Sequence, residues 1–278
     1  MRKELSVSEI QEISLHILKE IIALCKKLEL RYCLIYGSLI GAVRHKGFIP
    51  WDDDLDLMMP RQDYEQLIAY FIENRAMLEP LELFEPRVKK EYPYMIARIS
   101  DSRYILDAEN EEDYGIGVFV DIYPFDGLGN TKKEALHYGL TGDRLSSLCF
   151  QASRKRFEIG TTKSLLRKII KYPVFLFAHA IGKEWFQKKL AQTAGKKDYD
   201  TSEYIGCVVW LSGGEKDIFK REWFEGTAEV LFGGVRVCIP KQYDRILRHI
   251  YGDYRKLPPA SEQKGHHNYK AYEKESVK

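Results

Sequence analysis

The sequence predicts an α/β protein of the α+β kind, in which a mixed sheet is flanked by helices and carries a helical insertion. Two patterns support this prediction. Apolar residues at helical spacing alternate with short β-like apolar runs in the first 130 residues and again after residue 201. Between these parts, residues 131–201 have a helical pattern and many basic side chains. The 278-residue chain has 45% hydrophobic and 30% charged residues, which is typical of a globular protein with ample core material.

Four helices are expected outside the insertion. The first begins at a capping box formed by Ser6 and Glu9. It continues as a stripe of apolar residues at helical spacing: Ile10, Ile13, Ile17, Ile21 and Leu24. A second, short helix is expected over 39–44. A third follows Pro60, a residue suited to a first helical turn, and a fourth covers 242–250.

Short apolar runs between these helices predict the strands. They lie at 32–36, 54–58, 81–84, 94–100, 104–108, 117–123, 205–211 and 235–239. The expected organisation is a catalytic core over 1–130, a basic helical insertion over 131–201, and a C-terminal part over 202–278 that completes the core and its site.

Composition excludes several classes of protein. The formal net charge is only +2, so no nucleic-acid partner is expected. No run of about 18 apolar residues indicates a membrane-spanning helix, and the first residues lack the pattern of a secretory signal. The five cysteines have no zinc or CxxC spacing and are expected to be buried free thiols. We therefore expect a cytoplasmic protein.

The most informative residues are three aspartates. Asp54 and Asp56 lie on the same side of an expected strand, and Asp121 interrupts a later apolar run. Neighbouring carboxylates repel unless a cation lies between them, and Mg²⁺ (or Mn²⁺) binds such oxygen ligands together with substrate phosphates. The three residues are therefore candidate catalytic and metal-binding residues of one site. The alternatives are a solvated acidic turn at 52–54 and an ordinary edge-strand acid at Asp121.

Candidate phosphate-binding residues lie close to these acids. Gly37 allows the backbone to approach a ligand closely, and Ser38 offers a hydroxyl at a bend just before an expected helix. Four basic or imidazole side chains would pair with donor phosphates: Arg44, His45, Lys46 and Arg98. The alternative for the first three is a solvated basic loop, and Arg98 also has an alternative without a ligand.

A longer motif joins these residues. Gly37-Ser38 followed by Asp54-Leu55-Asp56-Leu57 resembles the signature of the nucleotidyltransferase fold. The whole string over 36–57, together with 119–127 and 251–259, resembles the LicD family of phosphocholine transferases, to which the fukutin-related ribitol-phosphate transferases are distantly similar. The resemblance therefore extends over most of the chain and is weakest in the insertion.

The resemblance implies a nucleotidyltransferase-like fold and a divalent metal ion held by Asp54, Asp56 and Asp121. It implies CDP-choline or another CDP-alcohol as the donor, and a sugar hydroxyl of teichoic acid, lipopolysaccharide or capsule as the acceptor. His266 and His267, in a C-terminal motif of the family, would close over the donor. The sugar hydroxyl would attack the phosphorus that bears choline, CMP would leave, and Asp121 is the preferred acceptor of the hydroxyl proton.

Two other functions stay open at this point. One is a nucleotidyltransferase that releases pyrophosphate, and the other is a non-catalytic, membrane-associated assembly protein with a decayed site. A choline headgroup would need aromatic ring faces, for which Trp51 and Tyr123 are candidates because they adjoin the acids. Core packing is the alternative for both rings.

The insertion contains a strongly basic segment over 154–189. Ten lysines and arginines face only two glutamates there, and apolar residues are interleaved with them. Such a mixture can bind an anionic membrane surface, which would suit a lipid-linked acceptor. The alternative is a subdomain that packs its apolar face inward.

Overall fold

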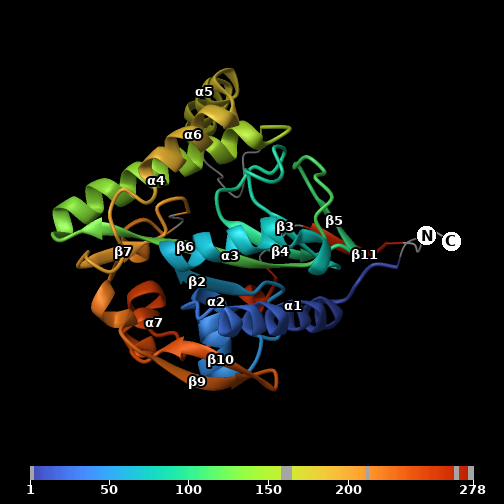
Figure 1. Ribbon diagram of the computed structural model, residues 1–278. Coiled ribbons are helices and arrows are strands. Elements are labelled where there is room, and N and C mark those ends of the chain that lie inside the picture. Colours follow the sequence, from blue (N-terminus) through green and yellow to red (C-terminus); the bar gives the residue numbers. More distant parts are fainter. Residues whose placement is uncertain (1–2, 158–164, 211–212, 266–268, 275–278) are drawn as a thin grey trace.

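The computed structural model describes residues 3–157, 165–210, 213–265 and 269–274 (Figure 1). At its centre lies a seven-stranded sheet. Its strands are β1 (Cys33–Leu34), β2 (Asp56–Pro60), β3 (Leu81–Phe84), β4 (Ala97–Asp101), β6 (Phe119–Gly129), β7 (Tyr204–Gly206) and β8 (Phe219–Lys220). The main path runs β1-β2-β6-β4-β3, and β7 and β8 extend the sheet from the end of β6.

The sheet is mixed, as predicted. Strands β2 and β6 run parallel, whereas β1 with β2, β4 with β6, and β3 with β4 are antiparallel. Strand β6 lies between β2 and β4, and all eleven of its residues are buried. Because strands buried on both faces have no solvent side, β6 is a near-continuous apolar run, and its few acids stand out against it.

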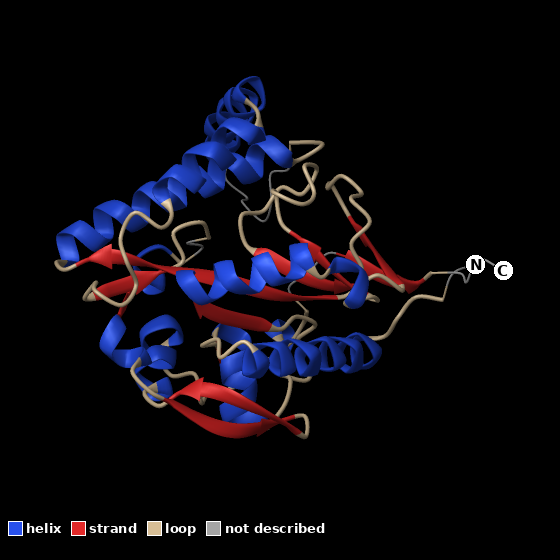
Figure 2. Ribbon diagram, in the orientation of Figure 1, coloured by secondary structure: helices blue, strands red, loops and turns tan. Residues whose placement is uncertain are grey.

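Helices cover the sheet (Figure 2). Helix α1 (Val7–Lys27) contacts β6 and β4, and α3 (Arg61–Glu73) contacts β2, β3 and β6. The predicted capping box is present, since the Ser6 side chain accepts from Glu9 N and the Glu9 side chain accepts from Ser6 N. The expected apolar stripe of α1 faces inward, with Ile17 and Ile21 fully buried.

A short helix precedes β2 along the chain. Helix α2 (Tyr36–Ile40) continues as a π-helical turn (Gly41–His45), so the helix predicted over 39–44 begins three residues earlier. Gly37 and Ser38 therefore lie inside the helix and not in a bend before it. Tyr36 starts the helix with a φ of 51°, a left-handed value that is uncommon for a residue with a side chain.

In its described residues, the predicted helical insertion forms three helices at one side of the sheet (Figure 1). They are α4 (Lys132–Ser153), α5 (Leu165–Ile181) and α6 (Lys183–Thr193). Helix α4 packs against β6 and β7, and it also contacts α5 and α6. Helix α5 is thus held mainly by other helices of the insertion.

The C-terminal part returns to the core. A hairpin of β9 (Thr227–Phe232) and β10 (Val235–Pro240) precedes α7 (Tyr243–Tyr251), and β11 (Tyr269–Glu273) pairs with β5 (Tyr104–Ala108). The hairpin turn is Gly233-Gly234, and both have positive φ, as a two-residue turn requires. Short 3₁₀ helices occur at Arg75–Met77, Gly214–Asp217, Arg221–Phe224 and Ala260–Glu262. The strand predicted at 205–211 is shorter, and β8, β9 and β11 were not predicted.

Two further expectations can be compared with the structure. All five cysteines are free thiols; four are buried and Cys238 is half-buried. Across the described ranges, no helix combines the length and the apolar character needed to cross a membrane.

Candidate active site

An acid-lined cavity of about 700 Å³ opens at the start of β2. Residues of α2, the loop before β2, β6 and the C-terminal part surround it. The lining of the cavity includes Tyr36, Gly37, Arg44, Trp51, Asp52, Asp54, Asp56, Tyr123, Trp210, Lys216, Tyr251, Tyr254 and Lys256. We call this space the acid-lined cavity.

Sheet register brings the three predicted aspartates together. In the parallel pairing of β2 with β6, Asp56 lies directly opposite Asp121, and Asp121 N donates to Leu55 O at 2.9 Å. Asp54 precedes Asp56 by two residues, and both line the acid-lined cavity. Neighbouring strands lie about 4.8 Å apart, so two carboxylates from separate parts of the chain meet at one place.

Asp56 is the least compensated of these acids. Its side chain is buried, and among the described residues its Oδ1 has no hydrogen-bond partner. Burial, followed by the negative charges of Asp54, Asp121 and Asp52, raises its pKa well above the usual range, although a hydrogen bond with Tyr123 opposes this. A buried carboxylate in this setting is stabilised by a cation.

Asp121 has a different partner. Arg98 on β4 lies opposite it in the sheet register, and Arg98 Nε donates to Asp121 Oδ1 at 2.7 Å. Although burial lowers the pKa of Arg98, the Asp121 carboxylate raises it well above its ordinary value. Arg98 was expected to bind donor phosphates. It instead contacts Asp121 and does not line the acid-lined cavity.

The donor set can be tested against a divalent cation. Asp54 and Asp56 offer two carboxylates at one cavity, and the unpartnered Asp56 oxygen fits a hard cation with oxygen ligands. Over the part of the chain that the structure describes, no three His, Cys, Asp or Glu side chains are arranged to hold one metal ion. The residues thus fit a cation at Asp54 and Asp56, whereas the carboxylate of Asp121 is bound to Arg98.

Gly37 and Ser38 support the acids. A Cβ atom on Gly37 would lie 2.9 Å from Asp52 Oδ2, so glycine is required for the close approach of this carboxylate. Ser38 is buried, and its Oγ accepts from Asp56 N at 2.8 Å. Ser38 therefore positions the first residue of β2, and its expected contact with a phosphate oxygen stays a prediction.

Substituting Gly37 by Ala is expected to displace the Asp52 carboxylate and to lower kcat/KM about 10–100-fold, since misplacing a catalytic group by about 1 Å can cost about 100-fold. The melting temperature should change little, because the atom that the new Cβ would meet belongs to a side chain and not to the backbone. Gly47→Ala is the matched control, since its new Cβ would meet its nearest atom at 3.5 Å. Equal activity in both variants would show that Asp52 has no role at the site.

The basic residues after α2 divide into two groups. Arg44 lines the acid-lined cavity, donates to Tyr254 O at 2.6 Å, and has a pKa lowered by burial. His45 accepts from Arg44 Nε at 2.9 Å, and burial together with Arg44 lowers its pKa, so the ring is neutral at neutral pH. Lys46 is exposed and does not line the cavity. Arg44 is the one of the three placed to meet a ligand there.

Residues from the end of α7 complete the cavity. Tyr251 lines the cavity together with Asp54 and Asp56, and its side chain is 44% exposed. The motif over 251–259 indicated this region without giving its residues a role, and no sequence pattern pointed to Trp210 or Lys216. Trp51 and Tyr123, the candidate choline-binding rings, line the cavity, and both also pack against the hydrophobic core. His266 and His267 lie outside the described residues.

The fold and the site define a protein of the nucleotidyltransferase type, with paired acids at the start of parallel neighbouring strands. The family model described as the LicD/FKTN/FKRP nucleotidyltransferase domain matches residues 29–144 of this chain. The chain is 34% identical over 273 residues to the lipopolysaccharide cholinephosphotransferase LicD of Haemophilus influenzae, covering 97% of this chain and 99% of that one. This protein belongs to the LicD family.

Two further relatives match a shorter part of the chain. An uncharacterized protein of Rickettsia typhi is 37% identical over 73 residues, which are 25% of this chain and 24% of that protein. An uncharacterized protein of Rickettsia prowazekii is 39% identical over 73 residues, covering 25% and 27%.

Proposed function

We propose that this protein transfers phosphocholine, or a related substituted phosphate, from a CDP-linked donor to a sugar hydroxyl of a cell-surface glycan. CDP-choline is the proposed donor, and lipopolysaccharide, teichoic acid or capsule the acceptor. The observation that supports the proposal is that Asp54 and Asp56 line one cavity and Asp121 lies opposite Asp56 in the sheet, in a chain that is 34% identical to a lipopolysaccharide cholinephosphotransferase along almost its whole length.

Asp54, Asp56 and Asp121 would hold the divalent cation, Mg²⁺ or Mn²⁺. When bound, the cation would neutralise charge on the diphosphate and on the departing CMP. The protein's own groups bind and orient the donor. Arg44, Lys216 and Lys256 line the same cavity with positive charge and would meet the phosphate and ribose side of the donor.

The transfer itself is a displacement at phosphorus. The bond between the sugar oxygen and the phosphorus that bears choline forms while the phosphoanhydride bond breaks, and CMP leaves with the electron pair. Asp121 accepts the hydroxyl proton in this proposal, because it lies between the acid-lined cavity and a neighbouring cavity described below. Arg98 Nε donates to Asp121 Oδ1 at 2.7 Å, and this bond keeps the Asp121 carboxylate oriented until substrate binds.

Product analysis tests this function. With CDP-choline labelled in choline and lipopolysaccharide that lacks phosphocholine, label should enter the glycan while CMP appears in equal amount. Release of pyrophosphate from a nucleoside triphosphate would favour the alternative nucleotidyltransferase reaction. Absence of both products with Mg²⁺ and with Mn²⁺ would favour a non-catalytic role.

We further propose that the insertion docks on an anionic membrane. The outward side of α5 exposes Tyr172, Val174, Leu176 and Phe177, each at least 41% exposed, while Phe175 and Ala178 face inward. Trp185 on α6 adds an exposed ring, and Lys188 and Lys189 beside it are exposed. Exposed apolar residues next to lysines match the interface between headgroups and acyl chains.

Flotation with vesicles containing phosphatidylglycerol checks this surface. Phe177→Asp is expected to lower the vesicle-bound fraction at least about tenfold, because it loses the burial of one aromatic side chain and adds a repelled charge. Met77→Asp is the matched control, since Met77 is 80% exposed and lies outside the insertion. Binding that is equal in both variants, or absent in the wild type, would remove the membrane surface from the account.

A further inference from the structure

A second cavity lies beside the acid-lined cavity. It measures about 280 Å³, and six aromatic side chains contribute to its wall: Tyr94, Tyr114, Phe119, Phe150, Trp210 and Tyr269. We call it the aromatic cavity. Trp210 lines both cavities. Because side chains alternate along a strand, Phe119, Asp121 and Tyr123 project from the same face of β6. Asp121 therefore lies between Phe119 of the aromatic cavity and Tyr123 of the acid-lined cavity.

Polar groups are fixed among these rings. The carboxylate of Glu111 accepts from Tyr94 OH at 2.6 Å, from Tyr114 OH at 2.9 Å and from Arg154 at 3.1 Å. The Arg98 guanidinium lies 4.0 Å from the ring centre of Phe119, and that of Arg154 lies 4.0 Å from the ring centre of Phe150. The cavity thus combines ring faces with ordered donors and acceptors.

This combination suits a sugar better than a quaternary ammonium group. Two guanidinium groups already lie over the rings, so another cation would meet like charge where it needs ring faces. A neutral pyranose instead packs its C–H faces on aromatic rings, and its hydroxyls bond to carboxylate and guanidinium groups. The charges of Arg98 and Arg154 are matched by Asp121 and Glu111.

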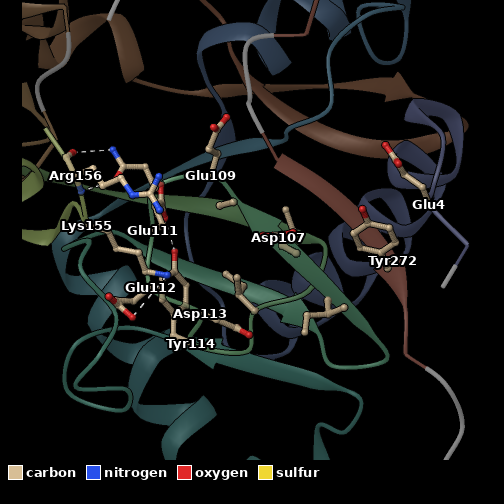
Figure 3. A pocket seen from close by; sticks show the side chains of 15 residues that line it. Glu4, Asp107, Glu109, Glu111, Glu112, Asp113, Tyr114, Lys155, Arg156 and Tyr272 are labelled. Carbon is tan, nitrogen blue, oxygen red and sulfur yellow. Dashed lines mark hydrogen bonds and ion pairs between the residues drawn. The ribbon is translucent and has the colours of Figure 1, made fainter. Parts of the chain in front are cut away.

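A larger groove adjoins the aromatic cavity and shares part of its lining, and Figure 3 shows the side chains that line this groove. It measures about 920 Å³, and the two spaces share Leu106, Ala108, Glu109, Glu111, Tyr114 and Ile116. Six acidic side chains line this outer groove, against the two basic side chains of Lys155 and Arg156. Its volume exceeds what a single sugar needs, and its charge disfavours a polyanionic chain.

We infer that the aromatic cavity binds the sugar that carries the accepting hydroxyl, and that the outer groove binds neutral sugars attached to it. This inference rests on the proposed function and names its acceptor class. The donor occupies the acid-lined cavity, and the two substrates meet at Asp121 and Trp210. A stretch of glycan free of phosphate groups fits the outer groove, whereas a chain of phosphodiesters does not.

Substitution of Phe150 by Leu tests the acceptor side alone, because Phe150 lines the aromatic cavity and not the acid-lined one. The acceptor is the oligosaccharide released by mild acid from lipopolysaccharide that lacks phosphocholine. We expect its KM to rise about tenfold, as for the loss of one well-packed aromatic contact. The KM for CDP-choline should not change, and neither should the rate at which CDP-choline is slowly hydrolysed to CMP when no acceptor is present. Met77→Leu is the control, since Met77 is 80% exposed and lines none of these three spaces.

A binding measurement separates this inference from the proposed reaction. Saturation-transfer NMR of the same oligosaccharide, without donor, should show contacts with the wild-type protein that weaken in Phe150→Leu. An oligosaccharide with phosphate groups should bind more weakly than the one without them. Glu112→Lys should reduce this difference in affinity, because it replaces an exposed acidic side chain of the outer groove by a basic one. Loss of transfer with retained sugar contacts would refute only the reaction. Sugar contacts and acceptor KM that are unaffected by Phe150→Leu would refute the acceptor site.

Discussion

Substituting Asp56 by Asn is expected to abolish transfer while making the metal-free protein more stable. Asp56 is a buried carboxylate whose pKa is raised by burial and by three neighbouring acids. Its proton therefore stabilises the fold fully at pH values below about 4, the usual aspartate range. That stabilisation is lost as the pH rises through the raised pKa of the folded state. Asn carries no charge, so the variant escapes this loss.

The comparison uses thermal unfolding from pH 4 to 8, with and without Mg²⁺. The wild type should lose stability with rising pH relative to Asp56→Asn, and Mg²⁺ should stabilise the wild type but not the variant. Turnover should fall more than about 100-fold, since changes to groups that merely support metal ligands already cost about 10–100-fold. Asp244→Asn, at an exposed carboxylate of α7, is the control. Retained turnover in Asp56→Asn would contradict the metal role.

Substituting Arg98 by Met is expected to lower the free energy of unfolding by about 3–5 kcal/mol, the scale for removing one partner of a buried ion pair. The side chains of Arg98 and Asp121 are 12% and 5% exposed, so solvent screens them weakly. Removing the guanidinium leaves the Asp121 carboxylate facing the Asp56 carboxylate. Mg²⁺ should then stabilise Arg98→Met more than it stabilises the wild type, because Asp121 is available to the cation.

Denaturant unfolding of Arg98→Met, of Asp121→Asn and of the double variant Arg98→Met/Asp121→Asn measures the coupling between Arg98 and Asp121. The double variant should recover part of the stability lost by Arg98→Met. Arg236→Met is the matched control, since Arg236 pairs with Glu229 at the surface, where the two side chains are 79% and 65% exposed, and it should cost at most about 1 kcal/mol. A loss for Arg98→Met no greater than this control would mean that the ion pair is not important to the fold.

The sequence predicted the parts of the site that depend on local periodicity. Alternation along a strand placed Asp54 and Asp56 on one side, and an acid in a long apolar run indicated that Asp121 had a special environment. In the structure β2 begins at Asp56, so Asp54 precedes the strand, but both carboxylates line the acid-lined cavity. Strands β2 and β6 are parallel neighbours with Asp56 opposite Asp121. The capping box of α1 was predictable for the same reason, since Ser6 and Glu9 lie within one turn.

Features that depend on distant pairing were not predictable. The register that places Arg98 opposite Asp121 belongs to the antiparallel contact of β4 with β6, which no local pattern specifies. Arg44 bonds to Tyr254 across 210 residues of chain, so the return of the C-terminal part to the cavity is a tertiary effect. Trp210 likewise joins two cavities without a sequence signal.

The most direct test of the account is the position of a bound Mn²⁺ ion. A crystal of the protein grown with Mn²⁺ and CDP-choline should give an anomalous peak between the carboxylates of Asp54 and Asp56, with ligand distances typical of metal–oxygen bonds at about 2.0–2.2 Å. Asp121 should approach the same ion, and the diphosphate should complete its coordination. Donor bound with no peak at these acids, or a peak held by other residues, would contradict the claim that the three aspartates form the catalytic centre.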